Sequence, residues 1–121
     1  MATSLLRHPG FHAKQSPERI AVVMAESGAS LTYRELNAFA NRLARFYQAF
    51  GLEYGDHVAY QLENRVECPA LQGGAHYAGL YYTFLSTRLT PAESAYIVED
   101  CDARVLVLSA RCATPELLTA I

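Results

Sequence analysis

The stretch that decides the fold runs from Leu80 to Ser109 and reads LYYTFLSTRLTPAESAYIVEDCDARVLVLS. Its two apolar runs, 80–85 and 104–109, lack alternation, which is typical of strands covered on both faces. Between them, T-P-A-E at 90–93 predicts a helix start, because threonine can cap the helix, proline takes its first position and glutamate its third. The helix should end near Asp100. A strand, a helix and a second strand in this order predict a right-handed crossover between parallel strands.

Further toward the N-terminus, the strongest helix pattern starts at Thr32 and ends at Gly51. Thr32 and Glu35 form a T-x-x-E capping box, and a glycine at position 51 suits the left-handed backbone that closes a helix. Apolar side chains recur at spacings of three and four, as on one face of an amphipathic helix: Leu36, Phe39, Ala40, Leu43, Tyr47 and Phe50.

A strand at 57–62 and a helix over 65–78, with Asn64 as its cap, should lie between these two regions. This helix is poor by intrinsic propensity. Pro69 removes a hydrogen bond in its second turn, and each glycine of the pair at 73–74 costs ~1 kcal/mol relative to alanine. We therefore expect tertiary packing to hold the helix, and the glycines to permit close approach of a neighbouring element.

The ends of the chain complete the pattern. Residues 1–15 predict a short amphipathic helix broken at Pro9-Gly10, segments 20–24 and 28–31 predict a β-hairpin, and a last helix begins near Thr114. The order predicts an α/β fold, with a largely parallel sheet, helices on both of its faces and an N-terminal β-hairpin. No linker divides residues 1–121, so they should form a single unit.

Composition excludes several classes of protein. The net charge of −2 over 121 residues argues against a nucleic-acid-binding surface. No apolar run reaches the ~20 residues of a membrane span, and the N-terminus lacks the apolar core of a signal peptide. The cysteines (Cys68, Cys101 and Cys112) are odd in number and form no C-x-x-C pair, as in a reducing compartment. We expect a cytoplasmic protein.

Motifs for catalysis or metal binding are weak in this sequence. The glycines at 73, 74 and 79 lie within and after a helix, where they favour packing over dinucleotide binding. His8 and His12 have the i,i+4 spacing of a metal pair, but Pro9-Gly10 should break the helix between them. The carboxylates near residue 100 favour a solvated turn over an acid/base pair.

Five ordered segments carry a family resemblance. They are LTYRELNAFANRLA (31–44), GDHVA (55–59), LENRVE (62–67), GLYYT (79–83) and STRLTPAESAYIVED (86–100). In this order and spacing they resemble the N-terminal part of AMP-forming acyl-CoA synthetases, members of the adenylate-forming superfamily, which includes luciferases and peptide-synthetase adenylation domains.

The resemblance implies a reaction. In that family, ATP and a carboxylic acid give an acyl-adenylate and pyrophosphate, and the thiol of CoA then gives the thioester and AMP, with Mg as the metal. The family's Ser/Thr/Gly-rich loop ending in P-K-G and its C-terminal lysine have no match here, and Lys14 lies in the wrong segment. The resemblance thus implies an N-terminal fragment of the large domain of a fatty-acid or related ligase, inactive alone and with no cofactor bound to it.

The resemblance implies one binding residue. In some CoA ligases of the family, an arginine in the segment matching S-T-R-L-T contacts a nucleotide phosphate of CoA, and Arg88 matches it. A guanidinium suits bidentate phosphate contact. Tyr77, Tyr81 and Tyr82 could also approach a ligand, although packing in a buried strand explains them better.

Alternatives remain open on the sequence alone. The chain could belong to a peptide-synthetase adenylation domain or an acyl-carrier ligase, or it could be a stand-alone α/β binding module. A sheet separated from the rest of a larger domain would expose apolar faces and strand edges, so we expect the chain to self-associate.

Overall fold

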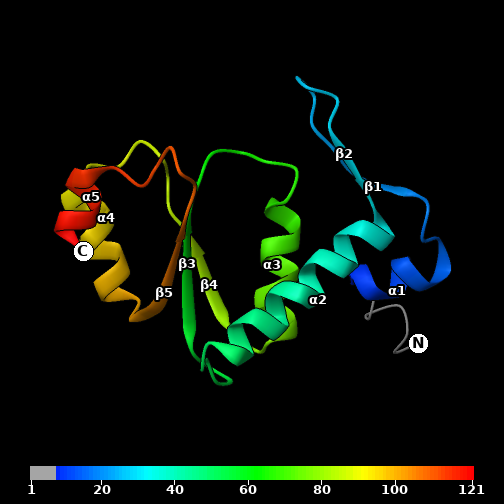
Figure 1. The fold of residues 1–121 in the computed structure, drawn as a ribbon, viewed down its shortest axis with the longest axis horizontal. Helices are drawn as coiled ribbons and strands as arrows, with labels where there is room; N and C mark the ends of the chain where they lie inside the picture. The colour runs from blue at the N-terminus through cyan, green and yellow to red at the C-terminus, as the bar shows by residue number, and fades with distance from the viewer. Residues whose placement is uncertain (1–7) are drawn as a thin grey trace.

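The computed structural model describes residues 8–121. Figure 1 shows a β-hairpin and two groups of helices separated by a narrow sheet. In chain order the elements are α1 (Pro9–Gln15), β1 (Ile20–Val23), β2 (Ser30–Thr32), α2 (Tyr33–Ala49), β3 (His57–Gln61), α3 (Cys68–Tyr77), β4 (Tyr81–Phe84), α4 (Pro91–Asp100), β5 (Ala103–Leu108) and α5 (Pro115–Ala120).

Two sheets form. Strands β1 and β2 pair antiparallel as the predicted hairpin, and the other three are parallel in the order β4-β3-β5. The chain steps from β3 to β4 and then returns past β3 to β5. Because crossovers between parallel strands are right-handed, this reversal places α3 and α4 on opposite faces. Figure 1 shows α2 and α3 on one face and α4 and α5 on the other, which confirms the predicted α/β fold with its hairpin.

The predicted helix ends of α2 and α4 are confirmed. Thr32 and Glu35 exchange hydrogen bonds at the start of α2, and Thr90 and Glu93 do so at the start of α4. Gly51, just past α2, has a φ of 102°, which glycine adopts without steric cost. Local chemistry thus sets these boundaries.

The core lies between α2, α3 and the sheet. Gly73 and Gly74 let the two helices approach closely, as expected, since a Cβ at position 74 would stand 2.7 Å from Leu43 Cδ2 and one at position 73 would stand 3.2 Å from Ala40 Cβ. The core contains a cluster of buried side chains: Tyr47, Leu52, Val58, Tyr60, Leu71, Ala75 and Leu80.

Two predictions about α3 are wrong. Asn64 does not cap it, because the helix begins at Cys68 and its N-cap, Glu67, makes no side-chain capping bond. Pro69 therefore lies in the first turn, where a missing N–H costs no helical hydrogen bond. Residues 63–67 instead cross from the end of β3 to the helix as an irregular segment with a turn.

The reading of β4 as a strand covered on both faces is also wrong. It lies at one edge of the sheet, and Tyr81, Tyr82 and Phe84 are 66%, 41% and 38% exposed. The predicted break at Pro9-Gly10 is corrected as well, because Pro9 begins α1 and His8 caps it. The first part of that predicted helix lies outside the described residues.

Within residues 8–121, no helix combines the length and the apolar character that a membrane crossing requires.

Candidate functional site

A polar cleft lies where the three parallel strands end. The chain leaves β3 toward α3 on one face and β5 toward α5 on the other, and neighbouring strands whose connections diverge in this way leave a crevice at their carboxyl ends. The cleft has a volume of about 370 Å³. Its polar lining comes from Gln61, Glu63, Thr87, Ser94, Arg111 and Thr114.

Gln61 ends the central strand and is almost completely buried. Its Nε2 donates to the backbone oxygen of Ser86 and to the Oγ of Ser94, each at 2.9 Å. Ser86 follows β4, and Ser94 lies in the first turns of α4. One side chain therefore joins the central strand to the segment that closes one side of the cleft.

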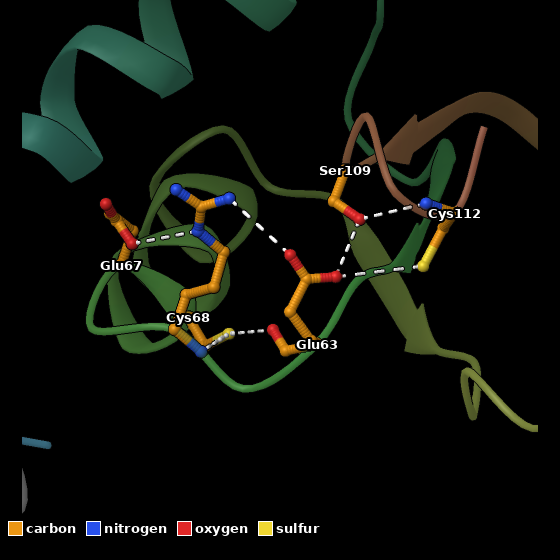
Figure 2. A network of polar contacts seen from close by, with 6 residues as sticks. Glu63, Glu67, Cys68, Ser109 and Cys112 are labelled. Carbon is orange, nitrogen blue, oxygen red and sulfur yellow. Dashed lines mark hydrogen bonds and ion pairs between the residues drawn. The ribbon is translucent and has the colours of Figure 1, made fainter. Parts of the chain in front are cut away.

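Glu63 organises the opposite wall (Figure 2). Its Oε2 accepts a 2.8 Å hydrogen bond from the Ser109 hydroxyl and lies 3.9 Å from the Cys112 sulfur, while its Oε1 is 3.7 Å from Arg65. A backbone N–H bond at Glu63 and the Ser109 hydroxyl hold the pKa of the Glu63 carboxyl below its ordinary value, aided by the charges of Arg65 and Arg111. The carboxylate is therefore ionised at neutral pH.

Arg88 lies on the exposed turn after β4. Its backbone N–H donates to Ser86 Oγ at 3.2 Å, and within residues 8–121 its guanidinium makes no hydrogen bond or ion pair. The residues on either side of it, Thr87 and Leu89, line the cleft. Arg88 therefore stands beside the cleft with all of its side-chain donors available.

The three tyrosines that the sequence suggested as ligand contacts lie outside the lining of the cleft. Tyr77 donates from its hydroxyl to Asn37 Oδ1 at 2.7 Å and thereby ties α3 to α2. Tyr81 and Tyr82 stand on the exposed edge strand, and none of the three lines the cleft. The Tyr77 contact supports packing of α3 on α2 rather than ligand binding.

The two histidines of the possible metal pair make other contacts. His8 accepts a hydrogen bond from the Gly10 N–H through its Nδ1, and His12 packs on Tyr33 with ring centroids 4.9 Å apart. In the described part of the chain, no group of three His, Cys, Asp or Glu side chains could hold a metal ion. Lys14 borders a separate groove between α1 and α2.

Sequence reasoning missed most of the cleft. Gln61, Glu63, Ser109 and Arg111 follow or end apolar runs, and this is the signal that could have marked them, since carboxyl ends of parallel strands share one edge. They belong to segments about 46 residues apart in the chain, and strand pairing alone brings them together.

Comparison with known proteins identifies the family. The model of the family described as AMP-binding enzyme matches residues 11–120. Long-chain-fatty-acid–CoA ligase FadD13 of Mycobacterium tuberculosis is 35% identical over 98 residues, which are 81% of this chain and 20% of the relative. Fatty acid–[acyl-carrier-protein] ligase ScoC of Streptomyces coeruleorubidus is 32% identical over 105 residues, covering 87% of this chain and 20% of the relative.

Solved structures agree with this assignment. The inhibitor-bound N-terminal domain of FACL13 from Mycobacterium tuberculosis superposes with a TM-score of 0.83 at 32% identity, covering 92% of this chain and 28% of that one. The chain spans about a fifth of the length of the curated relatives described above. On the family match and on this shared fold, the chain belongs to the AMP-binding enzyme family.

Proposed function

We propose that this chain forms the beginning of the large domain of an AMP-forming acyl-CoA ligase, and that Arg88 contacts a phosphate of CoA. The observation that carries the proposal is an exposed guanidinium that has no partner within residues 8–121, held on a short turn beside a polar cleft. The named activity of FadD13 supports CoA as the acceptor and a fatty or related carboxylic acid as the substrate.

The charges of the cleft favour one placement of the phosphate. Glu63 is ionised, so an anion is repelled from the wall formed by Glu63 and Ser109. Arg88 beside the cleft and Arg111 in its lining offer positive charge. The charge of Arg111 is partly balanced by Glu63, so a phosphate is expected nearest Arg88, where a charge-assisted hydrogen bond is strongest. For ATP and magnesium we propose no binding residue within this chain.

Adding CoA to the isolated chain tests the contact. We expect weak binding, seen by NMR as shifts of the Arg88 side-chain N–H signal and of the backbone signals of residues 86–89. Loss of a charge-assisted hydrogen bond of about 1.5–3 kcal/mol should weaken binding tenfold or more in Arg88→Ala. Arg104→Ala is the matched control, because Arg104 lies at the amino end of β5 and pairs with Asp56. Equal affinity in the two variants would contradict the proposal.

We also propose that the chain alone is catalytically inactive, because the family's phosphate-binding loop and C-terminal lysine have no counterpart in it. A pyrophosphate-release assay with ATP, magnesium and a panel of carboxylic acids should show no turnover. Turnover that follows the 121-residue chain through purification would overturn this.

An acyl-carrier ligase is the second candidate, favoured by the similarity to ScoC. In that case the acceptor thiol belongs to a carrier protein. Binding of a phosphopantetheine-bearing carrier protein, with no response to CoA, would favour this candidate over the first.

A further inference from the structure

We propose that Gln61 is a positioning residue, whose buried amide holds the turn that carries Arg88 against the end of the central strand. The proposal rests on the proposed function only in giving Arg88 a ligand. The tie itself is a feature of the fold and does not depend on that ligand.

The Gln61 amide bonds to both ends of the segment from Ser86 to Ser94. Nε2 donates one hydrogen to the Ser86 backbone oxygen, two residues before Arg88, and the other to Ser94 Oγ in α4, both at 2.9 Å. Gln61 is 3% exposed and Ser94 is 1% exposed. Because a backbone oxygen can only accept, the nitrogen of the amide must face Ser86, which fixes the orientation of the side chain.

The turn has little else to hold it. The last ladder bond of this strand runs from Leu85 N–H to Tyr60 O at 2.7 Å, and the next fixed point is the cap of α4 at Thr90. Between them the bonds are local, including a long one of 3.4 Å from Leu89 N–H to Ser86 O. In the described part of the chain, no side chain other than that of Gln61 donates to residues 86–94 from outside them.

The Gln61 amide also lowers the stability of the fold in one respect, which an apolar side chain would not do. Gln61 Oε1 is buried and has no hydrogen-bond partner within residues 8–121. An unpaired buried acceptor is destabilising, and an apolar side chain would suit a buried strand position better. The glutamine thus contributes through its two donated hydrogens, and their effect is to fix the turn beside the cleft.

The test uses the 121-residue chain and the variant Gln61→Met, which keeps the length of the side chain and removes the amide. The backbone order parameters of Thr87, Arg88 and Leu89 should fall from about 0.85 toward 0.6 or lower. CoA binding should weaken several-fold. In an Arg88→Ala background the same change should cause no further loss, because Gln61 acts through Arg88.

Thr32→Ala is the stability control. It removes the capping hydroxyl of α2, far from the turn, so it lowers stability without changing the order parameters of residues 87–89. Unchanged order parameters in Gln61→Met would overturn the proposal. A loosened turn in a chain that does not bind CoA would support the tie and overturn the assigned role of Arg88.

A measurement on the unaltered chain covers the case in which Gln61→Met fails to fold. The side-chain N–H₂ hydrogens of Gln61 should exchange with solvent much more slowly than those of Gln48, which is exposed on α2. Equal exchange rates would show that the amide is not held and would overturn the proposal.

Discussion

At the residue scale, two buried tyrosines form a directed chain of hydrogen bonds. The Tyr60 hydroxyl donates to the Leu71 backbone oxygen at 3.0 Å, so the Tyr47 hydroxyl, 2.5 Å from it, must donate to Tyr60. Burial raises the pKa of the Tyr60 hydroxyl well above its ordinary value, which keeps this donor protonated. These two hydrogen bonds connect α2, β3 and α3 within the core.

Because the hydrogen bonds run in this direction, the two hydroxyls should contribute unequally to the free energy of unfolding. Tyr60→Phe should lower the free energy of unfolding by about 1–3 kcal/mol, because it removes both bonds and leaves the Tyr47 hydroxyl buried without an acceptor. Tyr47→Phe should cost less, because Tyr60 keeps its bond to Leu71. Urea unfolding measures both, and a larger loss in Tyr47→Phe would contradict the assigned direction.

At the element scale, the capping boxes of α2 and α4 form as the sequence predicts. The Thr90 backbone N–H donates to Glu93 Oε1 at 2.8 Å, and its hydroxyl accepts from the Glu93 N–H at 3.2 Å. The hydrogen bonds from Thr90 hold the pKa of the Glu93 carboxyl below its ordinary value of 4.5. Capping depends on residues within one turn of each other, which explains why it was predictable.

The lowered pKa of Glu93 predicts a pH dependence of stability. A carboxyl with a lower pKa in the folded state contributes stability above pH 4.5 and loses that contribution as the pH falls through the folded value. Thermal melts between pH 7 and pH 3 should therefore show a smaller acid-induced drop in Glu93→Gln than in the unaltered chain. Glu26→Gln, an exposed change in the hairpin turn, is the control, and an equal drop in both variants would contradict the assignment.

Elements that depend on distant partners were predicted less well. The apolar run at 80–85 looked like a fully covered strand, yet β4 is an edge strand with Tyr81, Tyr82 and Phe84 exposed. Its position depends on strand order, and a local apolar pattern carries no information about which strands become neighbours. The start of α3 was missed because Pro69 suits the first turn of a helix, so the helix begins later than the periodicity suggested.

At the scale of the whole molecule, the three-stranded sheet leaves β4 unpaired along one side. Tyr81 is 66% exposed there, and exposed apolar strand edges promote pairing between chains. We predict that the chain self-associates and that Tyr81→Lys reduces the association. Val23→Lys is the control, because Val23 is 62% exposed on the hairpin, away from this edge.

Light scattering across a concentration series measures this association. The average mass should rise with concentration in the unaltered chain and in Val23→Lys, and should rise less in Tyr81→Lys. A strict monomer at high concentration would contradict the prediction.

The sequence by itself determined the local features: the capped starts of α2 and α4, the approximate strand positions, the α/β order and the family resemblance that singled out Arg88. The tertiary structure alone decided that β3 is the central strand and that β4 and β5 lie at the edges, and it brought Gln61 to Ser86 and Ser94 and Glu63 to Ser109. The physical reason is that capping and periodicity act within a few residues. The cleft arises from parallel strand pairing, which joins segments separated by crossover helices.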